Sequence, residues 1–241
     1  MDPKQIVADG YDRIAERHAE WSRGVRVDER ERYTSLVLTE LPAGARVLEL
    51  GSGVGVPTTK RLAERFRVIG MDISPRHIEM ARRNVPNAAF VQADMTALDL
   101  PTAGFDGVTA FYSITHVPRE QHGPLLAAIA RWLRPGGMFV AALGARDVVG
   151  DVEDDWLGAP MYFSHYDTGT NKRLVEKTGL RIVSAREETA DEDGTRPRSY
   201  GSWHESLERP EAPSRSTPSR FWRGRAACAR LRRACERCAM R

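Results

Sequence analysis

Three glycines that follow a short apolar run form the stretch of this chain best suited to holding a ligand. The apolar run 47–50 ends at Gly51, and Gly53 and Gly55 follow before a helix-like segment begins. A buried parallel strand that ends in a ligand-admitting turn has this pattern. Glycine lacks a Cβ, so the backbone can adopt a positive φ and approach a bound molecule, which the amides of the next helix then face. The turn therefore predicts a site for a nucleotide-like ligand.

Three carboxylates stand beside apolar runs, where they can meet hydrogen-bond donors of that ligand. Glu49 precedes the glycine turn, Asp72 ends a second apolar run, and Asp94 follows a third. An ionised carboxylate only accepts hydrogen bonds, so it suits ammonium, hydroxyl and amino donors. Each carboxylate could also be an ordinary strand-end residue. Their order along the chain is what favours a common ligand site.

Two histidines and a tyrosine are candidates to move a proton. His116 follows the fourth apolar run, His165 lies in an aromatic-rich loop, and Tyr11 lies on an amphipathic stretch near the N-terminus. Histidine is the commonest general base because its charge changes near neutral pH. The alternatives are packed loop residues for the two histidines and a buried helix stripe for Tyr11. His18 and Trp21 share the stretch of Tyr11 and could close over the ligand with it.

The elements that must position these residues alternate between strand and helix. Amphipathic helices are expected at 3–22 and 28–40, where they can cover the ligand as a lid. Further along the chain, strands are expected at 46–50, 68–72, 89–92, 105–111, 138–143 and 180–185, and helices at 57–66, 74–84, 119–133 and 168–178. This alternation predicts an α/β fold with a doubly wound, mostly parallel sheet. The carboxyl ends of such strands meet at one edge, where ligands bind.

Several segments, taken in order, resemble the motifs of class I S-adenosylmethionine-dependent methyltransferases of the small-molecule type. They are the glycine turn at 49–55, the acidic strand end at 72–74, the segments 92–95 and 105–106, and the turn at 133–137. The sequence Tyr-Asp-x-Ile-Ala at 11–15 is also similar to the N-terminal segment of such enzymes. The resemblance covers about residues 5–188.

The resemblance implies a seven-stranded, Rossmann-like methyltransferase fold with S-adenosylmethionine as cofactor. The methyl group would pass to an oxygen, nitrogen or sulfur atom of a small-molecule acceptor, and we expect a role in secondary metabolism. Glu49 would meet the ammonium group, Asp72 the ribose hydroxyls, and Asp94 the adenine amino group. The cofactor-binding residues that it implies are Glu49, Gly51, Ser52, Gly53, Gly55, Asp72, Ile73, Asp94, Met95 and Phe111. The catalytic candidates remain His116, His165 and Tyr11, and no metal is expected.

The chain divides into lid helices at 1–40, a cofactor-binding domain at 41–190 and an atypical tail at 191–241. Residues 196–241 contain 12 Arg, no Lys and a net charge of +8, which leaves −5 for the rest of the chain. Prolines, serines and arginines predict a disordered tail. The seventh strand of the family, expected near 195–205, is doubtful because prolines and glycines there do not suit a central strand. Two explanations stay open: a shifted reading frame, or a genuine basic tail that binds nucleic acid or an acidic partner.

Composition excludes some classes of protein. No apolar run approaches the roughly 18 residues of a membrane span, and no secretion signal follows Met1, so we expect a cytoplasmic monomer or homodimer without a membrane partner. All three cysteines lie in the tail without partners at a zinc spacing. The acidic catalytic part makes a nucleic-acid substrate unexpected, although an RNA methyltransferase that uses the basic tail is an alternative. A nicotinamide-dependent oxidoreductase is another, disfavoured because Val56 replaces the last glycine of the dinucleotide fingerprint. A non-catalytic relative that binds the ligand is a third.

Overall fold

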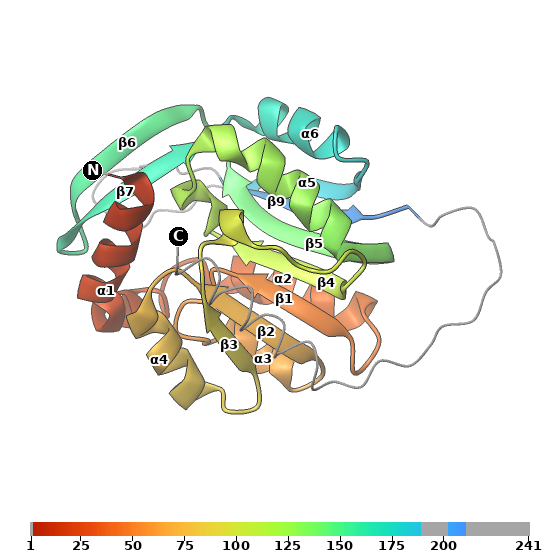
Figure 1. The fold of residues 1–241 in the computed structure, drawn as a ribbon, viewed down its shortest axis with the longest axis horizontal. Coiled ribbons are helices and arrows are strands. Elements are labelled where there is room, and N and C mark those ends of the chain that lie inside the picture. The colour runs from red at the N-terminus through yellow and green to blue at the C-terminus, as the bar shows by residue number, and fades with distance from the viewer. Residues whose placement is uncertain (1, 189–201, 211–241) are drawn as a thin grey trace.

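A seven-stranded sheet with helices on both faces forms the centre of the molecule (Figure 1). The computed structural model describes residues 2–188 and 202–210, without the side chains of 202–208. The strand order is β3-β2-β1-β4-β5-β9-β8, and the strands are β1 Arg46–Leu50, β2 Arg67–Asp72, β3 Ala89–Gln92, β4 Phe105–Phe111, β5 Leu133–Gly144, β8 Arg181–Glu188 and β9 Ser202–Glu208. The first five strands pair in parallel, and β9 lies antiparallel between β5 and β8. The predicted fold class is confirmed.

Alternate residues of the central strands bury against the two helical layers. Val47 of β1 packs with the cluster of α2 Val27–Glu40 and α3 Thr58–Ala63, whereas Leu48 packs with that of α5 His122–Trp132 and α6 Thr168–Glu176. The helix α4 Pro75–Asn84 covers β3 through Phe90. Successive side chains of a strand point to opposite faces, so a strand apolar at every position must be covered on both.

The helix α1 Pro3–Trp21 lies across the carboxyl edge of the sheet, between α4 and the hairpin of β6 Val148–Trp156 and β7 Ala159–His165 (Figure 1). Asp12 links α1 to the start of α4. The Oδ1 atom of Asp12 accepts hydrogen bonds from the Ser74 hydroxyl and the Arg76 amide. Arg17 donates to the Leu157 carbonyl at 2.6 Å. The strand order reverses between β1 and β4 at this edge, which is where open α/β sheets bind ligands.

The aromatic-rich segment that carries His165 was expected to be a loop, but it is a β-hairpin, so that prediction is wrong. β6 Val148–Trp156 and β7 Ala159–His165 form a separate antiparallel pair. Leu157 and Gly158 connect them with φ values of 53° and 97°, the positive pair that a tight two-residue hairpin turn requires. Leucine is rare at such a position, so the sequence carries no ordinary hairpin signal. α1 packs on β7, which buries Met161 and Ala159.

Two further expectations need correction. Residues 202–208 do form a strand, β9, although prolines and glycines upstream made one doubtful. Hydrogen bonds to β5 on one side and β8 on the other outweigh the weak local propensity. The helix expected at 57–66 is shorter, with Pro57 at the N-cap position of α3. The rest of the predicted tail, 191–201 and 211–241, lies outside the described residues. No helix within the described ranges has the length and apolar composition needed to cross a membrane.

Candidate active site

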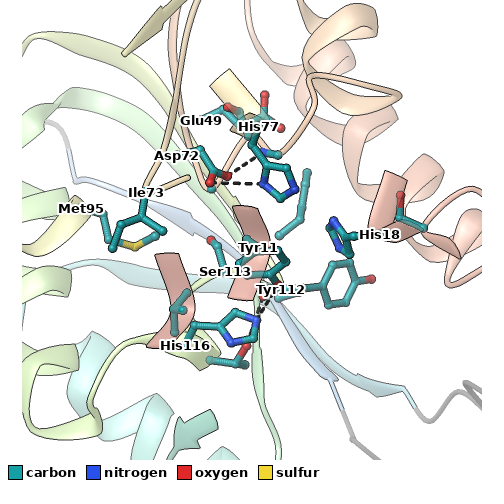
Figure 2. A pocket seen from close by; sticks show the side chains of 18 of the residues that line it. Tyr11, His18, Glu49, Asp72, Ile73, His77, Met95, Tyr112, Ser113 and His116 are labelled. Atoms are coloured by element: carbon teal, nitrogen blue, oxygen red, sulfur yellow. Dashed lines mark hydrogen bonds and ion pairs between the residues drawn. The ribbon is translucent and has the colours of Figure 1, made fainter. Parts of the chain in front are cut away.

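A cavity of about 230 Å³ opens at the carboxyl edge of the sheet beneath α1 (Figure 2). Every predicted site residue except Gly55 lines it. The strands β1, β2 and β4, the loop after β3, α1 and the β6–β7 hairpin all contribute side chains. Residues that are far apart in the sequence, such as Tyr11 and His165, therefore share one enclosure.

The glycine turn leaves room for a ligand at one of its three glycines. At the other two, the absent Cβ lets neighbouring side chains pack against the backbone. Gly53 has φ +52°, and a Cβ added to it would meet nothing within 4 Å. Gly51 has φ +73°, and a Cβ there would lie 2.2 Å from the Ser113 Cβ. Gly55 faces away from the cavity, because its Cβ would lie 3.1 Å from Val85 Cγ2 in the layer of α4. We therefore remove Gly55 from the candidate ligand contacts.

Asp72 is a buried carboxylate at the end of β2 with its acceptor sites partly filled. Oδ2 accepts from the Gly53 amide at 2.8 Å, and Oδ1 accepts from the Ser74 amide at 3.0 Å. His77 Nδ1 lies 3.3 Å from the same Oδ1. Burial opposes the charge of Asp72, but the neighbouring His77 and these two amides together hold its pKa below the usual value. The group is therefore an ionised acceptor at neutral pH.

Glu49 is buried near the end of β1, the strand that pairs with the strand of Asp72. Its Oε2 accepts from the Thr59 hydroxyl at 2.5 Å. Burial raises the pKa of Glu49 to about 8, against the opposing effects of Thr59 and Arg30. The carboxyl group thus holds a proton at pH 7 until a cation arrives beside it. A ligand ammonium group is such a cation.

A cluster of charged residues from the start of α2 lies near Glu49. Arg26 and Arg30 line the cavity and lie 5.3 and 5.7 Å from the centre of the Tyr112 ring. Arg26 pairs with the buried Glu29 at 3.2 Å, and Arg30 donates to backbone carbonyls of the α1–α2 connection. Guanidinium groups suit carboxylates. A buried carboxyl group and two guanidinium groups in one cavity match the ammonium and carboxylate of an amino acid.

Asp94 lies at the opposite end, after β3. Its Oδ1 accepts from the Thr96 amide at 2.8 Å, and its Oδ2 accepts from Lys4 Nζ at 2.7 Å. Lys4 also donates to the Thr96 hydroxyl, so the first turn of α1 is tied to the loop that carries Asp94. Ile73 and Met95 lie next to each other here (Figure 2). Two apolar side chains and one carboxylate oxygen with spare acceptor capacity suit an aromatic ring that bears an amino group.

Tyr11 and His116 form a hydrogen-bonded pair in the middle of the cavity. Tyr11 Oη lies 2.8 Å from His116 Nε2, and His116 Nδ1 lies 2.8 Å from the Tyr162 carbonyl oxygen. A carbonyl only accepts, so Nδ1 carries the hydrogen and Nε2 accepts the hydrogen of the Tyr11 hydroxyl. Burial lowers the pKa of His116 to about 4, so the imidazole is neutral at pH 7.

His165, the third catalytic candidate, is held at the cavity wall. It is buried at the end of β7, and its Nδ1 donates to the Arg146 carbonyl at 2.5 Å. A Cβ on Gly144 would lie 2.2 Å from its ring, so β5 and the imidazole are in close contact. Burial lowers the pKa of His165. This packing places the imidazole in the cavity wall, against β5.

Further rings complete the enclosure: His18, which was expected to close over the ligand, and Trp156 and His77, which were not among the predicted site residues. Trp156 of the hairpin lies 5.6 Å from the Tyr11 ring and 5.7 Å from the His18 ring. Burial lowers the pKa of His18 to about 3. His77 lies 5.0 Å from Tyr11. Among the described residues, no group of three or more His, Cys, Asp and Glu is arranged to hold a metal ion.

The cavity as a whole fits an adenosyl amino acid. Ile73, Met95 and Asp94 suit the base, Asp72 suits a sugar hydroxyl, and the Glu49 end suits an amino acid group. The buried Ser52 hydroxyl, which has no partner among the described residues, adds a donor beside the glycine turn. The ring-lined middle, with Tyr11 and His116, is then left for a second molecule.

Comparison with known proteins finds sequence similarity in the part of the chain that contains the glycine turn, Asp72 and Asp94. A family model described as a methyltransferase domain matches residues 47–137. The S-adenosyl-L-methionine-dependent Diels-Alderase iccD of Talaromyces variabilis is 37% identical over 167 residues, 61% of this chain and 56% of that protein. Trans-aconitate 2-methyltransferase of Methylobacterium nodulans is 38% identical over 121 residues, 48% of this chain and 45% of that protein. The chain thus spans about half the length of these relatives.

Solved structures agree on the fold. Magnesium protoporphyrin IX methyltransferase of Synechocystis PCC 6803, with bound SAH, superposes with a TM-score of 0.66 over 86% of this chain and 100% of that one, at 16% identity. Identity this low is evidence of a common fold alone. The order of the predicted motifs, the matched domain and this fold are mutually consistent.

Proposed function

We propose that this chain, which belongs to the class I S-adenosylmethionine-dependent methyltransferases, transfers the methyl group of that cofactor to a small-molecule acceptor. The acceptor would lie in the ring-lined middle of the cavity, between α1 and the β6–β7 hairpin. The name of one relative, trans-aconitate 2-methyltransferase, specifies a small-molecule acceptor and supports this class of substrate. The rings of Trp156, Phe163 and Tyr11 favour an acceptor with flat apolar parts.

The hydrogen-bonded pair of Tyr11 and His116 is the strongest support for this function. Tyr11 donates its hydrogen to His116 Nε2, so the tyrosine oxygen can accept the proton of an acceptor hydroxyl, amine or thiol while its own proton passes to the imidazole. The Tyr162 carbonyl holds His116 in the tautomer that makes this transfer possible. We therefore expect the methylated atom to carry a proton, with a hydroxyl oxygen as the leading case.

The bonds balance in a single displacement. When bound, the cofactor would supply a methyl carbon on a positively charged sulfur, and the sulfur would keep the C–S electron pair as the carbon bonds to the acceptor atom. The acceptor proton reaches Tyr11, and the Tyr11 proton reaches His116. The positive charge that appears on the imidazole replaces the one lost from the sulfur, so the buried pocket keeps its net charge. α1 and the hairpin exclude water and hold the acceptor in line.

An acceptor screen tests this function. S-adenosylmethionine is incubated with phenols, hydroxy acids and polyketide alcohols, and S-adenosylhomocysteine is measured by mass spectrometry. We expect turnover with at least one hydroxylated compound and a loss of roughly 10²-fold or more in Tyr11→Phe. Tyr166→Phe is the matched control, since Tyr166 stacks on His122 outside the cavity. Equal turnover in Tyr11→Phe and wild type would exclude the proposed proton path.

A second candidate is a cyclisation that leaves the cofactor intact. The relative from Talaromyces variabilis is a Diels-Alderase that depends on S-adenosyl-L-methionine, and its likeness extends over 61% of this chain. A ring-lined pocket suits the folding of a flexible polyene as well as the binding of a methyl acceptor. Product formation without S-adenosylhomocysteine would favour this candidate over methyl transfer.

A further inference from the structure

His77 is a buried histidine of the cavity that the motifs do not assign. It lies in the first turn of α4, where its amide donates to the Ser74 side chain that caps the helix. Its side chain is 2% exposed, and Figure 2 shows the ring inside the pocket beside Asp72. Nδ1 lies 3.3 Å from Asp72 Oδ1, and a carboxylate only accepts, so Nδ1 carries the hydrogen. Nε2 is buried, and no described atom bonds it.

The acceptor capacity of Asp72 is nearly used up. An ionised carboxylate offers about four lone-pair sites. The amides of Gly53 and Ser74 and the imidazole of His77 take three of them. About one site is left, whereas a ribose brings two hydroxyl donors. Because the recess is closed to solvent, the second hydroxyl needs another acceptor in the protein.

We propose that His77 is a specificity-determining residue for the cofactor ribose. Asp72 accepts one ribose hydroxyl, and the lone pair on His77 Nε2 accepts the other. In the neutral imidazole, the bond from Nδ1 to Asp72 sets the tautomer that leaves this lone pair in place. Tyr11 and His18, with ring centres 5.0 and 5.3 Å from that of His77, close the recess against water. The inference rests on the cofactor assigned to this family and adds a residue to its recognition.

Two variants separate the two nitrogens of His77. In His77→Asn the side-chain amide stands where Nδ1 is and keeps a donor to Asp72, but the acceptor at Nε2 is lost. In His77→Gln the amide oxygen reaches the position of Nε2 and keeps that acceptor. The ligands are S-adenosylhomocysteine and its 2′-deoxy and 3′-deoxy analogues, titrated at pH 8 by calorimetry.

In wild type, we expect each deoxy analogue to bind roughly tenfold more weakly than the parent ligand. In His77→Asn, the parent ligand weakens by a similar factor and one deoxy analogue binds no worse than the parent. His77→Gln restores the discrimination. Arg83→Gln, at an exposed position on the same helix, controls for a general effect of substitutions in α4. Its affinities for the three ligands should equal those of wild type.

If His77→Asn keeps the full discrimination against both deoxy analogues, the inference is overturned. The same holds if His77→Gln behaves as His77→Asn. Circular dichroism and a urea midpoint check that the variants are folded. If the wild-type protein binds neither S-adenosylhomocysteine nor its analogues, the proposed function fails, and this result is distinct from the failure of the role given to His77.

Discussion

Binding of the cofactor product should release a proton from Glu49. Burial raises the pKa of this carboxyl group to about 8. About nine tenths of Glu49 therefore carry a proton at pH 7, and about half at pH 8. A ligand ammonium in contact with the carboxyl favours its ionised form and drives the proton off. We predict the release of about 0.9 proton per S-adenosylhomocysteine at pH 7 and about 0.5 at pH 8.

The assay is calorimetry in two buffers of different ionisation enthalpy, phosphate and Tris, because a released proton adds the heat of buffer protonation. His18 and His116, with pKa values of about 3 and 4, are neutral throughout and release nothing. The Glu49→Gln variant should bind S-adenosylhomocysteine more weakly. Its binding enthalpy should not differ between the two buffers through proton release from this position. Equal binding enthalpies for wild type in both buffers at pH 7 would refute the placement of the ammonium at Glu49.

Three further predictions follow from the buried groups. The kcat/KM of a methylated hydroxyl acceptor should fall only as the pH drops toward 4, because His116 must be neutral; a limb near pH 6.5 would contradict its role. Asp72→Asn should weaken S-adenosylhomocysteine binding roughly 100-fold, because a charged acceptor is lost. The same loss should lower the urea midpoint of unfolding. An affinity within twofold of wild type would contradict this prediction. The free energy of unfolding should fall as pH drops from 6.5 through 4, because His18, His116 and His122 protonate only on unfolding; a constant urea midpoint over that range would count against it.

The parallel strands and the glycine turn were predictable because their signals are local. Apolar runs of four to seven residues, each followed by a turn or a cap, define β1 to β4 without knowledge of their neighbours. The cap at Ser74 is likewise visible in the Ser-Pro pair that begins α4. Residues directly after such strands must lie at one edge of the sheet, so Asp72 and Asp94 could be placed near each other.

The rest of the cavity depends on packing between distant segments. Lys4 bonds to Asp94 because α1 crosses the carboxyl edge of the sheet. Arg30 comes close enough to Glu49 to interact with its charge because the chain bends between α1 and α2. The role of Trp156 required the hairpin, whose Leu157–Gly158 turn has no ordinary sequence signal. His77 was detectable in principle, since the spacing from Asp72 puts it in the first turn of α4. A histidine in the first turn of a helix is, however, more often a surface residue.

Binding of S-adenosylhomocysteine, with NAD as the comparison, is the measurement that most directly tests the assignment of the cavity. Calorimetry on the wild-type chain should give saturable binding at one site for S-adenosylhomocysteine and no heat for NAD. Competition between S-adenosylmethionine and S-adenosylhomocysteine for that site should be complete. Saturable binding of NAD, with no binding of either adenosyl ligand, would contradict the assignment.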